Sequence, residues 1–360
     1  MTEWPSPDHV PDRLAEIALG GGLAVGVSLL LSPVVRRIAL RYGFNDRLLS
    51  HQHPPVKPRL GGVALVLAVV LAVIGTWPLF PERTPEEAGK LLGLMGGTLV
   101  LLVLGTVDDR RPLGAGVQFG GQFAAASLAI AGGVVIGPVS NPLGTPLTDS
   151  MLDLPPWIAV ALTYLWLLGA MNAVNFLDGL DGLAAGVIGI AALVLSLHSY
   201  LLGQYTITLL AVALAAAAAG FLPFNTAPAR LTLGTSGSLF LGFFAGALAI
   251  VGGAKVASAL MVLGVPILDA AWIIVFRIMK GRSPFLGDRA HLHHRLLDLG
   301  LGHRRIVFLF YAVTALAGGL ALLVPSRLPK LYLLALLGVA GLGGLIAVAH
   351  RPRAEGRAPR

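Results

Sequence analysis

The sequence contains no cysteine. This absence excludes disulfide bonds, thiolate nucleophiles, and zinc or iron–sulfur sites that need cysteine ligands. Charged residues are scarce as well, at 12% of the chain compared with about 25% in soluble domains. Aromatic residues make up only 7%, so most of the 56% of hydrophobic residues are Leu, Ala, Val and Ile. This composition is typical of a chain that folds in lipid.

Apolar runs long enough to cross a bilayer as helices recur along the whole chain, each of about 17–25 residues. We predict one all-α integral membrane domain over residues 1–360, with about eleven transmembrane helices. The polar, Pro-rich residues 1–13 have no basic segment typical of a cleaved signal peptide. The predicted spans are Ile17–Val35, Leu60–Phe80, Leu91–Val107, Val117–Ile136, Ile158–Val174, Leu183–Leu202, Thr206–Phe221, Leu239–Ala254, Val256–Phe276, Ile306–Val324 and Leu331–Ala349.

The basic residues predict the orientation of these spans. The chain has 26 Lys and Arg residues, and most of them lie in loops on one side. The other side holds only Arg13, Arg83, Lys90, Lys255, Arg327 and Lys330. Because basic loops stay in the cytoplasm, the N-terminus is predicted outside and the C-terminus inside. The net charge of +8 would also suit nucleic acid, but its position in short loops beside spans favours membrane orientation and anionic ligands. No nucleic-acid partner is predicted.

The polar motifs fall on the predicted cytoplasmic side. They lie in loops near residues 36–59, 108–116, 172–182, 223–238 and 277–305, whereas the outer loops are short or featureless. Several polar loops that meet at one membrane face are what an interfacial active site needs. We therefore expect a multi-pass inner (plasma) membrane protein with its active site on the cytoplasmic face.

Two adjacent carboxylates, Asp108 and Asp109, end one predicted span. Neighbouring carboxylates repel each other, so one could act as a base or hold a cation. A solvated end of a helix, balanced by Arg110 and Arg111, is an equally good interpretation.

The run from Asn172 to Gly182 is more specific. Asn175, Asp178 and Asp181 follow one another at intervals of three, beside two Asp-Gly pairs at the end of a span. Carboxylate and amide oxygens of this kind suit Mg²⁺, which then binds substrate phosphates. The alternative is a connecting turn in which Asp side chains bond to the backbone.

Glycine and hydroxyl residues open the eighth predicted span. A loop of this kind at a helix N-terminus offers N–H groups to a phosphate, and Arg230 just before it favours that interpretation over an ordinary helix cap. Asn225 lies in the same loop. The residues involved at the span start are Gly234, Thr235, Ser236, Gly237 and Ser238.

Three histidines and two basic positions complete the candidate set. His291, His293 and His294 follow Arg289 in an Arg-rich loop and suit anion and sugar contacts or proton transfer better than zinc. Lys57 and Arg59 precede the second span and could bind phosphate or only anchor the loop. Asp269 lies inside a predicted span, where a charge is by default functional, and Arg277 is a candidate partner; a purely structural buried pair is an equally good interpretation.

With these motifs placed, the chain resembles the polyprenyl-phosphate N-acetylhexosamine-1-phosphate transferase family, over roughly residues 40 to 305. The likeness rests on five segments. The His-Leu-His-His-Arg run at His291–Arg295 is similar to the GlcNAc-1-phosphate transferase branch, whereas the related phospho-MurNAc-pentapeptide translocases have three adjacent histidines. The segments are Pro58–Gly62, Asp108–Asp109, Asn172–Ala184, Phe224–Arg230 and His291–Arg295.

The resemblance implies a chemistry and roles for these residues. The donor would be UDP-GlcNAc or a close relative, the acceptor undecaprenyl phosphate, the cofactor Mg²⁺ with Mn²⁺ as a substitute, and the product UMP. Asp108 or Asp109 would be the base, Asp178 and Asp181 metal or substrate ligands, and the three histidines pyrophosphate contacts. Whether the chain forms a homodimer stays open.

The chain departs from the family pattern at one position. The family has Gly-Asp-x-Gly-Ser before the eighth span, with the Asp as a Mg²⁺ ligand, and here Thr235 replaces it. The change predicts an impaired enzyme or an inactive scaffold. A peptidoglycan-precursor transferase and a lipid-carrier transporter are the rival functions. A transporter is disfavoured, because its polar site would lie near the bilayer midplane between repeated halves.

Overall fold

The computed structural model describes residues 10–45, 57–79, 84–140, 151–252, 256–279, 281, 291–324 and 327–350. Nearly all of these residues are helical. A two-residue antiparallel ribbon and one 3-10 turn, η2 (Trp77–Leu79), are the exceptions among the named elements. The helices are α1 (Val10–Tyr42), α2 (Gly61–Thr76), α3 (Pro85–Arg110), α4 (Ala115–Ala131), α5 (Pro156–Leu177), α6 (Leu183–Leu201), α7 (Tyr205–Asn225), α8 (Gly234–Val251), α9 (Val256–Val262), α10 (Gly264–Met279), α11 (Leu292–Asp298), α12 (His303–Leu323) and α13 (Arg327–His350); the ribbon is β1 (Val139–Ser140) with β2 (Met151–Leu152).

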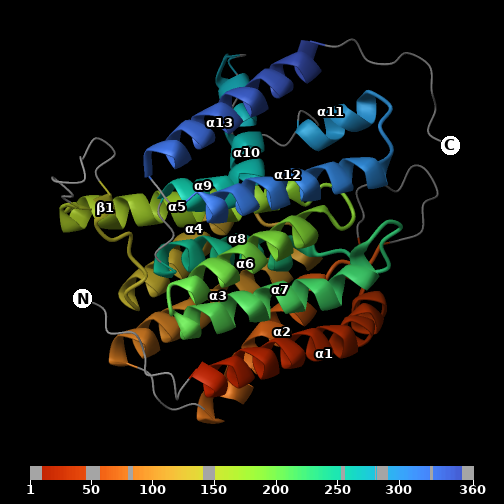
Figure 1. The fold of residues 1–360 in the computed structure, drawn as a ribbon. Coiled ribbons are helices and arrows are strands. Elements are labelled where there is room, and N and C mark those ends of the chain that lie inside the picture. Colours follow the sequence, from red (N-terminus) through yellow and green to blue (C-terminus); the bar gives the residue numbers. More distant parts are fainter. Residues whose placement is uncertain are drawn as a thin grey trace.

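Seven helices of the described part are long and apolar enough to cross a membrane. They are α1, α3, α5, α6, α7, α8 and α12, and shorter apolar stretches lie in α2, α10 and α13. The long helices run side by side in one bundle (Figure 1). The chain is thus a multi-pass, helical membrane protein, as predicted.

One predicted span is divided in the structure. The run Val256–Phe276 is not a single helix, because α9 ends at Val262 and α10 begins at Gly264. In Figure 1, α10 runs across the direction of the long helices. Pro266 explains the break, since a proline fits the first turn of a new helix but not the interior of a continuous one.

Helix α8 lies at the centre of the bundle, and its side chains are almost all buried. It packs against α2, α3, α5 and α6. Glycine allows the close approach to α5, since a Cβ on Gly242 would lie 2.5 Å from the carbonyl oxygen of Ala170. The N-terminus of α8 is thereby placed in the middle of the bundle end where the polar motifs gather.

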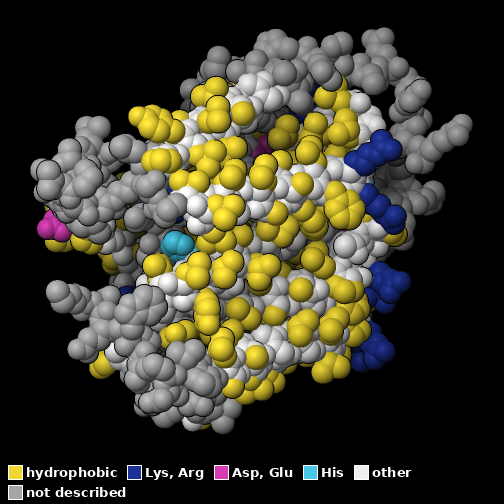
Figure 2. All heavy atoms as spheres, in the orientation of Figure 1, with side chains coloured by type: hydrophobic (Ala, Val, Ile, Leu, Met, Phe, Trp, Pro, Cys, Tyr) yellow, Lys and Arg dark blue, Asp and Glu magenta, His cyan; other side chains and the backbone are white. Residues whose placement is uncertain are grey.

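The surface agrees with a lipid environment. Large apolar side chains such as Leu30, Leu92 and Leu165 are 70–73% exposed. Figure 2 shows hydrophobic side chains spread over much of the described surface on one face. Lys and Arg gather along one edge of that view, where α1 ends and α12 begins. The exposed basic residues near this end of the bundle include Arg36, Arg37, Arg41, Arg230, Arg304 and Arg305.

Candidate active site

Two distant segments join to form the floor of the site. The N–H groups of Gly61 and Gly62 donate to the carbonyls of Thr232 and Leu233, at 2.9 and 2.8 Å. The N–H of Thr232 donates in turn to the carbonyl of Pro58, at 2.9 Å. This short pairing brings Lys57 and Arg59, which precede α2, to the N-terminus of α8.

Asp109 caps the N-terminus of α8 from another helix. Its carboxylate, at the end of α3, accepts the N–H of Thr235 at 2.7 Å, and the N–H and hydroxyl of Ser236 at 3.3 and 2.8 Å. The Nε of Arg59 lies 3.7 Å away. Leu233, the residue before α8, makes no side-chain hydrogen bond that caps the helix. The fully buried carboxylate of Asp109 accepts free N–H groups there instead, and the positive end of the helix dipole stabilises its negative charge.

Gly234 is required at this junction. Its φ of +75° lies in the left-handed region, and a Cβ there would sit 2.6 Å from both carboxylate oxygens of Asp109. A glycine at the first residue of α8 therefore permits the cap.

Asp108 has three donors of its own. Oδ1 accepts the N–H of Leu113 and the side-chain amide of Gln118, both at 2.8 Å, and Oδ2 accepts the hydroxyl of Thr235 at 2.6 Å. Unlike Asp109, Asp108 is only half-buried. It is the more exposed member of the pair.

Asp181 is held by a cation. The Nζ of Lys57 donates to both of its oxygens, at 2.9 and 2.7 Å, and the N–H of Ala229 donates to Oδ2 at 3.0 Å. The carbonyl oxygen of Asp181 lies 3.0 Å from Nε2 of His303, at the start of α12. Through its carboxylate and its backbone carbonyl, Asp181 thus ties the loop after α5 to three other parts of the chain.

Asp178 is different, because no hydrogen bond to its side chain occurs among the described residues. It follows α5 directly and is half-buried. Burial raises the pKa of Asp178 well above its ordinary value, Arg59 opposes the shift, and the charges of Asp109 and Asp181 add to it. Burial thus disfavours the ionised form of Asp178, and no hydrogen bond within the described residues offsets this.

The histidine segment, His291–Arg295, covers the loop that carries Asp178. His293 is fully buried, and neither of its ring nitrogens has a partner within the described part of the chain. Burial, with the neighbouring His294, lowers the pKa of His293 to about 3, so the ring is neutral. It lies directly on Gly179, where a Cβ would come within 2.1 Å of its Nε2. The ring of His291 is stacked on that of His293, with 5.6 Å between centroids, and the ring of His294 is tilted against it, with 4.3 Å between centroids.

Two of the predicted site residues make hydrogen bonds inside the fold. Asn172 pairs with Gln122 of α4, at 2.6 Å between amide nitrogen and oxygen. Asn225 accepts the N–H of Gly182 and donates to the carbonyl of Leu231, both at 3.1 Å. These bonds give both asparagines a structural task.

The remaining predicted residues take varied positions. A Cβ on Gly62 would lie 2.1 Å from the backbone nitrogen of Gly237, so the two glycines allow a close packing of α2 on α8. Ser238 is buried and bonds to the carbonyl of Thr235 at 3.4 Å, Asn175 is half-buried, and Arg230 is exposed. Arg289 lies outside the described residues. The functional role of every residue in the set stays a prediction.

The sequence interpretation missed three residues that shape the site. Gln118, His303 and Tyr311 hold Asp108, Asp181 and Gly182 respectively, and all three lie outside any recognisable motif. Asp269 was singled out as a carboxylate inside a predicted span, but the sequence did not identify His291 as its partner.

The donor set fits Mg²⁺ only in part. Among the described residues, no group of three or more His, Asp or Glu side chains is arranged to hold a metal ion. The oxygens of Asp181 and Thr235 are already in hydrogen bonds, to Lys57 and Asp108. Within the described part of the site, only Asp178 has carboxylate oxygens outside hydrogen bonds, which suits an ion held by one carboxylate together with substrate phosphates.

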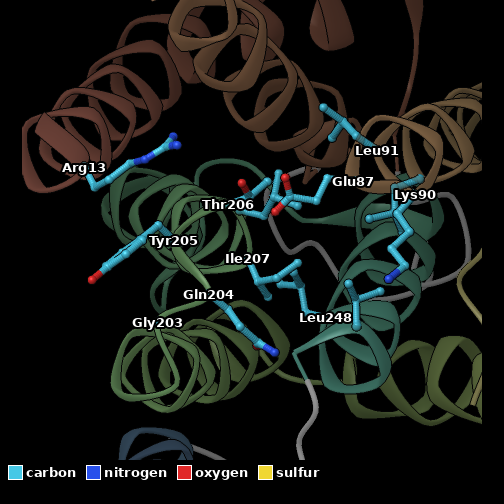
Figure 3. Close-up of a pocket in the computed structure, with 13 residues that line it drawn as sticks. Arg13, Glu87, Lys90, Leu91, Gly203, Gln204, Tyr205, Thr206, Ile207 and Leu248 are labelled. Carbon is cyan, nitrogen blue, oxygen red and sulfur yellow. The ribbon is translucent and has the colours of Figure 1, made fainter. Parts of the chain in front are cut away.

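A cavity of about 390 Å³ lies at the opposite end of the bundle (Figure 3). It is lined by the starts of α1, α3 and α7 and by the end of α8. Its two cations already face carboxylates on their own helices, Arg13 beside Glu16 and Lys90 beside Glu86. Both cations of the lining are thus paired, and the cavity is remote from the motif loops.

The fold and site thus define a multi-pass membrane protein whose carboxylates and cations meet at one end of a helical bundle. A family model described as glycosyl transferase family 4 matches residues 91–253. The chain is 31% identical over 309 residues to a Bacillus subtilis (strain 168) protein named probable undecaprenyl-phosphate N-acetylglucosaminyl 1-phosphate transferase, covering 84% of this chain and 83% of the relative.

Two further relatives have similar coverage. A decaprenyl-phosphate N-acetylglucosaminephosphotransferase of Mycobacterium tuberculosis is 32% identical over 369 residues, covering 94% of this chain and 90% of the relative. A phospho-N-acetylmuramoyl-pentapeptide-transferase of Geobacillus kaustophilus is 31% identical over 328 residues, covering 84% and 95%. The chain belongs to this family, the polyprenyl-phosphate N-acetylhexosamine-1-phosphate transferases, which confirms the resemblance seen in the sequence.

Proposed function

We propose that this protein transfers a sugar-1-phosphate, GlcNAc-1-phosphate above all, from a UDP-sugar to undecaprenyl phosphate and releases UMP. The observation that carries the proposal is the meeting of four carboxylates with Lys57 and Arg59 at the N-terminus of one buried helix. Such a site can bind a pyrophosphate and a second phosphate side by side. The names of the relatives agree with this substrate class.

The site is proposed to face the cytoplasm, with the N-terminus outside and the C-terminus inside. Eleven crossings would result if α9 and α10 together count as one. The edge of exposed Arg residues near the motif end supports this orientation. A nucleotide sugar made in the cytoplasm could then meet a lipid phosphate that arrives laterally from the membrane.

The proposed reaction is one in-line displacement. An oxygen of the acceptor phosphate forms a bond to the β-phosphorus of the UDP-sugar, the bond from that phosphorus to the bridging oxygen breaks, and UMP leaves with that oxygen. Asp108 is the half-buried carboxylate that could take a proton from the acceptor phosphate, whereas the buried Asp109 acts as an anchor. Arg59 and Lys57 would stabilise charge on the phosphate oxygens.

Mg²⁺, or Mn²⁺ in its place, would neutralise the pyrophosphate charge when bound. Asp178 is the carboxylate of this chain that could hold such an ion beside the substrate phosphates, and Asp181 would first have to exchange Lys57 for it. With Thr235 in place of the family Asp, the ion would lose one charged ligand. We infer a weakened metal site and a slow or impaired enzyme.

Purified protein in detergent tests the proposal directly. UMP release is measured with undecaprenyl phosphate and either UDP-GlcNAc or UDP-MurNAc-pentapeptide, with Mg²⁺ or with a chelator. We expect metal-dependent release with UDP-GlcNAc, since the His-Leu-His-His-Arg run is typical of that branch. Release with only the pentapeptide donor would support the rival transferase. No release from either donor, even by the Thr235→Asp variant discussed below, would contradict both.

A further inference from the structure

A buried aspartate in α10 contacts two successive residues of the histidine segment. Asp269 is only 2% exposed. Its Oδ2 lies 3.0 Å from Nδ1 of His291, and its Oδ1 accepts the N–H of Leu292 at 2.8 Å. One carboxylate thus holds both the ring and the backbone at the start of α11.

The contact has a chemical consequence for His291. An ionised carboxylate only accepts hydrogen bonds, so the proton between the two groups belongs to Nδ1 of His291. Nε2 is then the ring nitrogen that is left for other partners. The ring is further confined by Phe176 of α5 and by His293, with centroids 5.3 and 5.6 Å away. Its orientation is therefore set from three sides.

The same stack reaches the loop of the proposed site. His293, next in the stack, lies on Gly179, which directly follows Asp178. A shift of His291 would therefore move the rings that cover the Asp178 loop. The carboxylate of Asp269 is the group that ties this stack to α10.

We propose that Asp269 is a positioning residue that holds His291 with its proton on Nδ1, so that Nε2 is presented to the substrate phosphates. The inference rests on the proposed function. When Nε2 takes up or shares a proton, the Asp269 carboxylate offsets the charge that forms on the imidazole. This role explains why α10 carries a carboxylate among apolar residues, where an ionisable group is costly.

The variant Asp269→Asn separates positioning from simple structure. Asparagine has the same shape and still offers one oxygen to the N–H of Leu292, but its amide can only donate to Nδ1 of His291. The variant therefore reverses the ring's tautomer and leaves the proton on Nε2. Asp153→Asn, three residues before the start of α5 and away from the histidine segment, is the matched control.

The first measurement does not need activity. Protein labelled with ¹⁵N-histidine reports the tautomer of each of the nine histidines, and His291→Gln identifies the signal of His291. We expect a Nδ1–H tautomer in the parent and a Nε2–H tautomer in Asp269→Asn, with the control unchanged. A parent already in the Nε2–H form, or a variant that keeps the parent form, would overturn the proposal.

The second measurement tests the path of the effect. We expect Asp269→Asn to reduce UMP release at least thirtyfold at an unchanged unfolding temperature. In a His291→Ala background the same substitution should change the rate less than twofold, since its effect passes through the ring. Full activity of Asp269→Asn, or an equal loss in both backgrounds, would refute the inference. No UMP release by any form would instead refute the proposed function and leave the tautomer measurement valid.

Discussion

The hydroxyl of Thr235 donates a 2.6 Å hydrogen bond to Oδ2 of Asp108, across 127 positions of sequence. Two ionised carboxylates could not share this contact, because like charges so close together repel strongly in a partly buried site. A cation between them would remove the repulsion. The hydroxyl therefore occupies a place where an aspartate would call for a metal ion.

We expect Thr235→Asp to raise Mg²⁺-dependent UMP release at least tenfold, roughly 1.4 kcal/mol in the barrier. The added carboxylate would give the ion a charged ligand opposite Asp108. Thr235→Asn is the matched control, since it adds the shape without the charge and should give no gain. Rapid UMP release by the unmodified chain, with no gain in the Asp variant, would show that position 235 is not the metal anchor.

The same substitution should act differently on Asp109 and Asp178. Asp109→Asn weakens a buried cap with three donors and should lower stability by about 1–3 kcal/mol. Asp178→Asn loses no hydrogen bond and removes a charge that burial disfavours, so stability should hold or rise while UMP release is lost. Thermal unfolding in detergent, measured beside the rate, distinguishes the two. Equal destabilisation by both variants would contradict the assignment.

Lys57 is expected to matter for turnover rather than for folding. Its side chain is 37% exposed, so its ion pair with Asp181 should contribute only about 0–1 kcal/mol to stability. Lys57→Met should lower UMP release at least tenfold and barely change the unfolding temperature. Lys90→Met breaks a comparable pair with Glu86 at the other end of the bundle and should leave the rate alone. A similar effect of both variants would remove Lys57 from the site.

The absence of cysteine permits a clean test of orientation. A single introduced cysteine is the only thiol in the chain. A membrane-impermeant maleimide should label Arg305→Cys in inside-out vesicles only, because Arg305 is exposed at the motif end. It should label Glu86→Cys, a site 76% exposed at the other end, in right-side-out vesicles only. The reverse pattern would place the site outside the cell.

Hydrophobic length alone identifies most of the helices, because a span needs little else. The run Val256–Phe276 shows the limit of that signal. Its hydropathy is continuous, and only Gly264 and Pro266 indicate the break between α9 and α10. Helix α1 shows another limit, since it begins at Val10, before the polar Arg13 and Glu16, where an apolar run cannot be seen.

The site could be predicted as a set of residues but not as a set of contacts. The motif positions are visible in the sequence, whereas the pairing of Lys57 with Asp181 joins residues 124 positions apart and depends on how the helices pack. Spacing along one helix suggested Arg277 as the partner of Asp269, whereas in the structure the carboxylate of Asp269 contacts the ring of His291. The hydrogen bond of Asn172 to Gln122 joins residues of different helices in the same way and could not be predicted from the motif.

The cap of α8 by Asp109 also bears on how the chain is made. Ribosomes add about 5–20 residues per second, so α3 is synthesised on the order of ten seconds before Thr235 and Ser236 exist. During that time Asp108 and Asp109 stand at the membrane edge without the donors of α8 that later satisfy them. A chain interrupted before α8 would therefore leave the carboxylate of Asp109 without the three donors that cap it in the finished fold.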